Sequence, residues 1–246
     1  MRYLMLRYFQ DRLPGQLSLA ARAFFLAFLL LPFIVAVPVS FSPHVVFPPN
    51  GFTTKWYDAF FSSASFNKAW QVSLILAFAS ATLSTVAGAC FALAAARFDF
   101  PGRGFLINLS LSPLVIPGVA IGIGLVFLFA SIGLVESWTR LILAHAIVTT
   151  PYAVRVISAT LHGFDRSLEE AAMNLGATQG HAFRTVTIPI VRPGVAAAFL
   201  FAFMSSLDNL SVTVFVAQPG YYTIPVVLFG YVRDRFDPIV AVVTLV

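Results

Sequence analysis

Long apolar runs separated by short polar segments dominate this chain. Runs that approach or exceed the roughly 20 residues needed to cross a hydrocarbon core lie at about residues 23–41, 70–96, 105–134, 138–157 and 194–217. A sixth run begins at residue 238 and reaches residue 246. As a helix it would rise about 14 Å, under half of a core about 30 Å thick. The pattern predicts an all-α, polytopic transmembrane helix bundle of six spans, with the last one incomplete in this chain.

The same pattern divides the chain into two parts. Residues 1–69 hold an N-terminal segment, the first span and an external loop rich in Pro, Phe and Trp, and residues 70–246 hold the remaining transmembrane domain. Within the third run, Pro113 and Pro117 can kink or interrupt the span. Gly118 and Gly122 form a small-xxx-small pair, which usually marks close helix packing.

One polar interlude, at about residues 167–186, contains signals for two short helices. Ser167 followed by Glu170 forms a capping box, so we expect a helix to begin near Leu168. Gly176 stands where a left-handed C-terminal cap is expected. Thr178 can cap a second helix, running from residue 179 to residue 185. Pro189 and Pro193 are expected to limit its continuation into the next apolar run.

The chemistry of this interlude fits two interpretations. Small residues allow close approach by a partner, and mixed charges such as Asp165, Arg166 and Glu169 offer a polar rim. A docking surface is therefore one interpretation. An ordinary loop that carries two helical turns is the other.

Composition fixes the class of protein. The chain is 59% hydrophobic and 10% charged, against roughly 25% charged residues in a typical soluble protein. It is therefore expected to be an integral membrane protein. Its formal charge of +5 comes from scattered residues rather than a basic patch, which argues against a nucleic-acid partner. Cys90 is the only cysteine, so a disulfide within the chain is excluded.

The distribution of cations predicts the orientation. A cytoplasmic N-terminus follows the positive-inside rule because it places ten of the fifteen Lys and Arg residues inside and five outside. The polar interlude then faces the cytoplasm. The inside set is Arg2, Arg7, Arg12, Arg22, Arg97, Arg103, Arg155, Arg166, Arg184 and Arg192, and the outside set is Lys55, Lys68, Arg140, Arg233 and Arg235.

Several kinds of chemistry are missing from the sequence. A phosphate-binding loop needs a lysine after a glycine-rich turn, yet the only lysines, Lys55 and Lys68, follow Thr54 and Asn67. No metalloprotease spacing of His and Glu occurs, and the four histidines lie far apart. We therefore expect no catalytic residue, no metal and no cofactor bound by this chain.

Asp208 is the one carboxylate within a predicted span, and hydroxyl and amide residues surround it. An ionisable group at membrane depth should face a cavity, a pathway or a partner. One interpretation is a translocation pathway lined by Ser206, Asp208, Asn209 and Thr213, where a negative charge suits a cationic solute. The other is a hydrogen-bond network between helices. His145 is expected to be a hydrogen-bonded packing residue rather than a proton relay, because no carboxylate lies one helical turn away.

The polar interlude also carries a family motif. Glu170-Ala171-Ala172, then Gly176, then Val186, Ile188 and Pro189 stand at the spacing of the signature of ABC importer permeases, with two conservative departures. From about residue 70 onward the chain resembles the permease subunits of binding-protein-dependent ABC importers. The resemblance implies a type I permease fold, in which these seven residues belong to cytoplasmic coupling helices that dock on an ATP-binding subunit.

Further partners and a cargo follow from the same resemblance. It implies two ATP-binding subunits that hydrolyse ATP, a second permease subunit, an external solute-binding protein and a multi-pass location in the cell (inner) membrane. Residues 47–52, 206–209 and 219–225 resemble the spermidine/putrescine permease subgroup, which suggests a different chain as second permease and polyamines as cargo. A gradient-driven secondary transporter or channel without ATPase partners is the alternative function.

Overall fold

The computed structural model describes residues 15–235 and 237–246, and these are helices joined by turns and loops. Arg2, Arg7 and Arg12, on which the predicted orientation partly depends, lie outside the described residues. The chain separates into two compact units. Unit 1 contains the chain up to Ser63 together with Tyr231–Val246, and unit 2 contains Ala64–Gly230.

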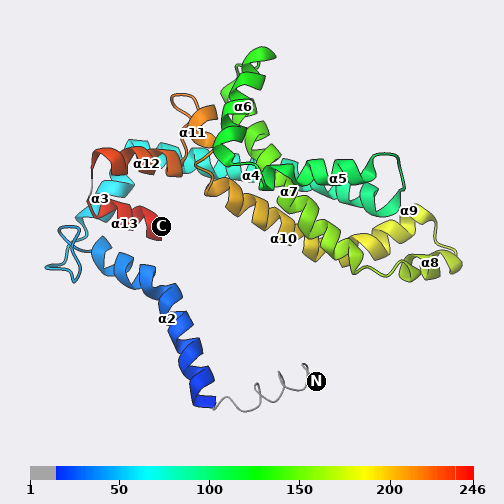
Figure 1. Ribbon diagram of the computed structural model, residues 1–246, viewed down its shortest axis with the longest axis horizontal. Coiled ribbons are helices and arrows are strands. Elements are labelled where there is room, and N and C mark those ends of the chain that lie inside the picture. The colour runs from blue at the N-terminus through cyan, green and yellow to red at the C-terminus, as the bar shows by residue number, and fades with distance from the viewer. Residues whose placement is uncertain (1–14, 236) are drawn as a thin grey trace. The chain divides into compact units, whose positions relative to one another are not determined.

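Three long helices form the centre of unit 2. They are α4 (Ala64–Arg97), α7 (Ser137–His162) and α10 (Ile188–Leu207), and each packs against the other two (Figure 1). Glycines permit the close approach. A Cβ added to Gly88 of α4 would lie 2.7 Å from Cβ of Ala153, and one added to Gly194 of α10 would lie 2.8 Å from Cβ of Thr160. Such small-residue contacts are typical of helix packing in membranes.

The third apolar run is broken. It forms α5 (Arg103–Leu111), the 3₁₀ turn η1 (Ser112–Leu114) and α6 (Gly118–Ser131), and the two helical parts are bent by 108°. The predicted interruption at Pro113 and Pro117 is confirmed. Residues 105–134 are therefore not one straight helix, because each proline lacks a backbone donor and its ring clashes with the preceding helical turn.

The fifth apolar run is also shorter than predicted. The helix α10 ends at Leu207, and the short helix α11 (Thr213–Val216) follows after a break. Packing of α11 against α6 uses the predicted glycine pair, since a Cβ on Gly118 would lie 2.9 Å from Cβ of Ser211 and one on Gly122 would lie 3.2 Å from Cα of Val212. Close packing at Gly118 and Gly122 is confirmed.

Unit 1 is built from the two ends of the chain. It contains α2 (Gly15–Ser40), α3 (Lys55–Ser62) and α13 (Ile239–Leu245), and α13 packs against α2 and α3. The helix α12 (Ile224–Asp234), which the sequence did not predict, connects the two units. Packing thus groups the last residues with the N-terminal segment, whereas the sequence pattern grouped them with residues 70–230.

Among the described residues, four helices are long and apolar enough to cross a membrane, or five if the bent α5–α6 pair is one span. These helices are α2, α4, α7 and the continuous stretch Gln179–Leu207. The membrane class predicted from composition therefore agrees with the fold.

Candidate functional site

Two short helices project from the end of unit 2 where α7 stops and α10 begins. They are α8 (Ser167–Asn174) and α9 (Gln179–Ala182), which we call the two-helix segment together with the turn that follows to Thr187. Gly176 joins them with a φ of 96°. The amide of Gly176 donates to the carbonyl of Met173 and the amide of Ala177 to that of Ala172. This pair of bonds is a Schellman motif, so the predicted left-handed cap is confirmed.

The first turn of α8 differs from the prediction. The helix begins at Ser167, and the side chain of its N-cap residue, Arg166, makes no capping hydrogen bond. The carboxylate of Asp165 instead accepts a hydrogen bond of 2.9 Å from the amide of Ser167. That bond lowers the pKa of Asp165 below its ordinary value. The predicted capping box between Ser167 and Glu170 is therefore wrong, because Asp165 already satisfies this donor.

The second helix continues into α10. Thr178 caps α9 by accepting a bond of 3.4 Å from the amide of His181, as predicted. The π-helical turn η2 (Phe183–Thr187) then connects α9 to α10 without a break. Pro189 does not stop the helix. It lies in the first turn of α10, next to the wider π turn, where a missing donor is best tolerated.

A charged contact attaches the two-helix segment to the bundle. Arg97, the last residue of α4, forms an ion pair of 2.5 Å with Glu169 of α8 and donates to Thr187 at 3.3 Å. Thr187 also donates to Glu169, and the guanidinium of Arg97 lies over the ring of Phe183. We call Arg97, Glu169 and Thr187 the Glu169 cluster. It connects α4, α8 and η2.

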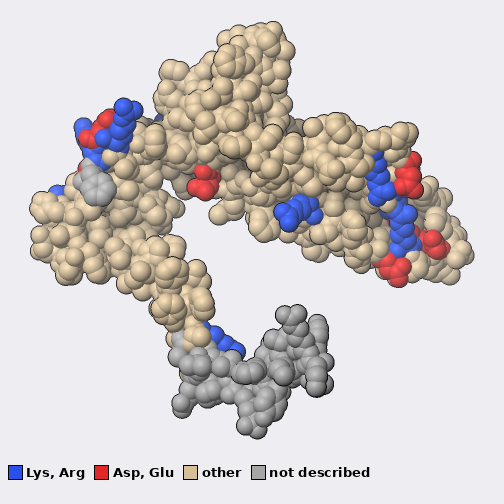
Figure 2. All heavy atoms as spheres, in the orientation of Figure 1, with Lys and Arg blue, Asp and Glu red and all other residues tan. Residues whose placement is uncertain are grey.

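The motif residues lie on and beside this segment with different exposure. Ala172 and Val186 are half-buried, whereas the remainder are exposed, namely Glu170, Ala171, Gly176, Ile188 and Pro189. Leu168, Met173 and Leu175 are also exposed, Leu175 by 90%. The space-filling view shows charges of both signs gathered around this end of unit 2 (Figure 2). An exposed apolar patch with a charged rim is typical of a docking surface.

The predicted pathway residues lie about 30 Å away, at the other end of α10. Asp208 is the C-cap residue that follows α10, and it is exposed. The prediction that it lies within a helical span is wrong. The carboxamide of Asn209 accepts a bond of 3.0 Å from the amide of Val212, which fixes the turn. Asp208 and Asn209 border a hollow of about 290 Å³ that is also lined by Pro113, Tyr152, Ser205 and Ser211, among others.

Ser206 and Thr213 belong instead to a buried network. His145 of α7 contacts the hydroxyl of Ser206 through Nδ1 at 2.7 Å and that of Thr213 through Nε2 at 2.9 Å. Ser206 also contacts the hydroxyl of Ser80 at 3.0 Å. All four residues are buried. We call them the His145 network. His145 is thus a hydrogen-bonded packing residue, as predicted, and it joins the two sides of the break at Asp208.

Comparison with known proteins decides the family. Residues 84–246 match the model of the binding-protein-dependent transport system inner membrane component. The chain belongs to this family. It is therefore a multi-pass inner membrane component of an importer, and the resemblance drawn from the Glu-Ala-Ala motif is confirmed.

Three curated relatives align with most of this permease. The putrescine transport system permease protein PotI of Escherichia coli (strain K12) is 35% identical, with 89% of this chain and 81% of PotI covered. The spermidine/putrescine transport system permease protein PotC of the same strain is 32% identical, with 86% and 81% covered. The trehalose transport system permease protein SugB of Mycobacterium tuberculosis is also 32% identical, over 74% of this chain and 67% of SugB.

Solved structures share the fold of the permease. The crystal structure of a bacterial ABC transporter involved in the import of the acidic polysaccharide alginate matches with a TM-score of 0.75 and 17% identity, covering 96% of this chain and 92% of that one. The same fold therefore occurs in importers of chemically different solutes.

Proposed function

We propose that this permease carries a small organic polycation of the polyamine class. One observation supports the cargo more than any other: PotI and PotC, which are named for putrescine and spermidine/putrescine, align with more than four fifths of the chain. The similarity to SugB means that family membership alone leaves the cargo open. The exposed carboxylate of Asp208 at the hollow favours a cationic solute.

The two-helix segment is the proposed contact with an ATP-binding subunit. Its exposed apolar residues and the exposed Glu170, Ala171 and Gly176 would lie in that contact. Val186, Ile188 and Pro189 follow where η2 joins α10, and Ala172 is half-buried on α8. The complete importer would contain two ATP-binding subunits, a second and different permease chain and an external solute-binding protein. The N-terminus and the two-helix segment would lie in the cytoplasm.

The proposed mechanism uses the continuity of α9, η2 and α10. Closure of the ATP-binding subunits would displace the two-helix segment, and the Glu169 cluster would transmit that displacement to α4. The unbroken helix would carry it along α10 to the break at Asp208 and Asn209. Ser206 and Thr213 would keep the two sides of that break together through His145. ATP would be hydrolysed by the partner subunits, because this chain lacks a phosphate-binding loop.

Uptake of radiolabelled putrescine by cells that express the complete importer tests this function. Asp208→Asn keeps the side chain's size and removes its charge, so we expect putrescine uptake to fall at least about tenfold, the effect of losing roughly 1.4 kcal/mol of charge attraction. The matched control is Asp99→Asn, which removes a carboxylate with 97% exposure far from the hollow.

Two results would contradict the proposal. Unchanged putrescine uptake in Asp208→Asn would exclude its charge from recognition. Uptake that continues when the ATP-binding subunits carry an inactivated nucleotide site would exclude coupling to ATP.

A further inference from the structure

A groove with a basic rim lies on unit 2 between α4, α5 and α7, close to the two-helix segment but separate from the hollow at Asp208. Its volume is about 410 Å³, within the range of small-molecule sites. Ala92, Ala95 and Val154 form a buried floor, and Phe91 and Ile107 are half-buried beside them. The walls are therefore apolar over most of their area.

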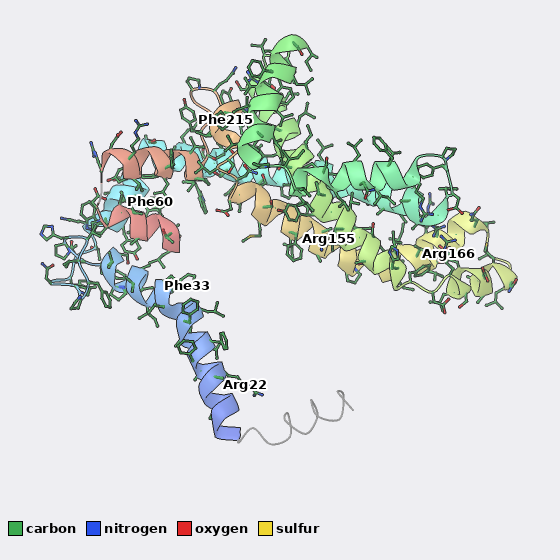
Figure 3. All side chains as sticks on the ribbon, in the orientation of Figure 1. Arg22, Phe33, Phe60, Arg155, Arg166 and Phe215 are labelled. Atoms are coloured by element: carbon green, nitrogen blue, oxygen red, sulfur yellow. The ribbon has the colours of Figure 1, made fainter. Side chains whose placement is uncertain are left out.

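The rim carries cations. Three arginines, Arg97, Arg103 and Arg166, line the groove beside His162, and among the described residues that line it there is no carboxylate. Figure 3 places Arg166 at this end of unit 2, near α8 and α9.

The charges of these arginines are satisfied to different degrees. Glu169 neutralises Arg97 in the Glu169 cluster. Arg103 pairs with Asp99 at 2.6 Å, but that carboxylate is 97% exposed, and such a pair contributes little. Arg166 donates to the carbonyl of Ala96 and has no carboxylate partner in the part of the chain that the structure describes. Arg103 and Arg166 thus keep donors available for an anion.

We propose that this groove binds an anionic phospholipid. The apolar walls suit an acyl chain, and Arg103 and Arg166 suit the phosphodiester group, to which guanidinium groups donate paired hydrogen bonds. Both arginines belong to the set that the positive-inside rule places at the cytoplasmic surface, where basic pockets between helices bind anionic headgroups. The inference needs the membrane location and the orientation of the chain, but neither the polyamine cargo nor the ATPase contact.

The bound lipid would connect four elements at the base of the two-helix segment, with the headgroup at α5 and α8 and the acyl chain on α4 and α7. Arg103 begins α5, Arg166 immediately precedes α8, and the floor belongs to α4 and α7. An anionic lipid would therefore hold α5 and the start of α8 against the bundle. A lipid without net charge would contact the apolar walls but bring no net negative charge to the two guanidinium groups.

Native mass spectrometry of the purified full chain, titrated with phosphatidylglycerol or phosphatidylcholine in detergent, tests the proposal. We expect preferential retention of phosphatidylglycerol. In Arg103→Gln with Arg166→Gln this retention should fall about 25-fold, because the loss of roughly fivefold for each arginine multiplies. The control pair Arg233→Gln with Arg235→Gln removes the same charge from unit 1 and should retain phosphatidylglycerol.

A second variant tests the shape of the groove without removing any charge. Ala96→Phe fills the groove while keeping every arginine, and it should also abolish the preference for phosphatidylglycerol. Each protein's thermal unfolding is measured to select folded variants. Equal retention of both lipids by the unaltered chain would overturn the proposal. So would full retention in Ala96→Phe, or displacement of the lipid by millimolar inorganic phosphate alone, which would indicate a free-anion site.

Discussion

At the scale of single residues, the buried side chain of His145 connects α7 to both α10 and α11. Its two ring nitrogens contact Ser206 and Thr213, which stand on opposite sides of the break after α10. Residues 208–212 at the hollow are therefore held at both ends by one imidazole of α7. The position of the Asp208 carboxylate depends on a network that is itself shielded from the hollow.

Replacing Ser206 with alanine should destabilise this arrangement. The change leaves Nδ1 of His145 without its hydroxyl partner, and hydrogen bonds between membrane helices contribute about 0.6–2 kcal/mol each. Ser84→Ala is the matched control, because the Ser84 hydroxyl bonds only to carbonyls of its own helix. Thermal unfolding of the purified chain should show a lower midpoint for Ser206→Ala than for Ser84→Ala. Equal midpoints would mean that the network adds no stability.

Gly176 should tolerate no β-branched side chain. An added Cβ would meet nothing within 4 Å, so the effect of Gly176→Val comes only from its φ of 96°. That conformation costs an L-residue about 1–2 kcal/mol, enough to reduce the populated Schellman turn by about 5- to 30-fold. We expect a matching fall in copurification of the ATP-binding subunit and in putrescine uptake.

Gly180 offers the control for this prediction. It is equally free of neighbours within 4 Å, but its φ lies outside the left-handed range, in helix α9. Gly180→Ala should therefore retain both copurification and uptake. Normal uptake in Gly176→Val would show that the left-handed turn is dispensable.

At the scale of elements, the Glu169 cluster attaches α8 to α4 and η2. Glu169→Gln removes the charge that pairs with Arg97 while keeping the shape of the side chain, and hydrogen bonds to charged groups contribute about 1.5–3 kcal/mol. Hydrogen exchange measured by mass spectrometry should accelerate in residues 167–187. Asp99→Asn, which breaks only an exposed pair, should leave that exchange unchanged. Unaltered protection in Glu169→Gln would exclude the cluster as the attachment.

Local signals explain which elements the sequence could predict. Pro113, Pro117, Gly176 and Thr178 act on their own neighbours, so their effects on the backbone could be inferred from a few residues. The Glu169 cluster could not be inferred, because its ion pair joins residues 72 positions apart. The sequence places Glu169 in the charged rim of the polar interlude and gives it no partner on another helix.

The break after α10 exposes a second limit of pattern reasoning. Residues 208–213 include polar side chains that can end a helix, but apolar residues precede and follow them. Hydrophobicity alone therefore predicted one span over residues 194–217. The partners of His145 lie 61 and 68 positions away. The sequence allowed either a hydrogen-bond network or a pathway for these residues. The fold assigns Ser206 and Thr213 to the network and places Asp208 and Asn209 at the hollow.

At the scale of the whole molecule, unit 2 has the two-helix segment at one end and the break at the other. Its orientation in the membrane can be measured with a single cysteine. In a Cys90→Ser background, expressed without the ATP-binding subunits that would cover α8, Ala171→Cys places a thiol on an exposed position of that helix. We expect a membrane-impermeant maleimide to label it only after the cells are permeabilised. Labelling in intact cells would place the two-helix segment outside and exclude an ATPase contact there.

The π turn at Phe183–Thr187 has a consequence for register. A π turn contains one residue more than an α-helical path between the same points, so α9 and α10 are joined by a one-residue insertion. Deleting a single residue there would restore a uniform helix and rotate α9 about the axis of α10 by roughly 100°. Every side chain that α9 offers to a neighbour would then point in another direction. The five residues of the π turn thus fix the rotation of α9 about the axis of α10.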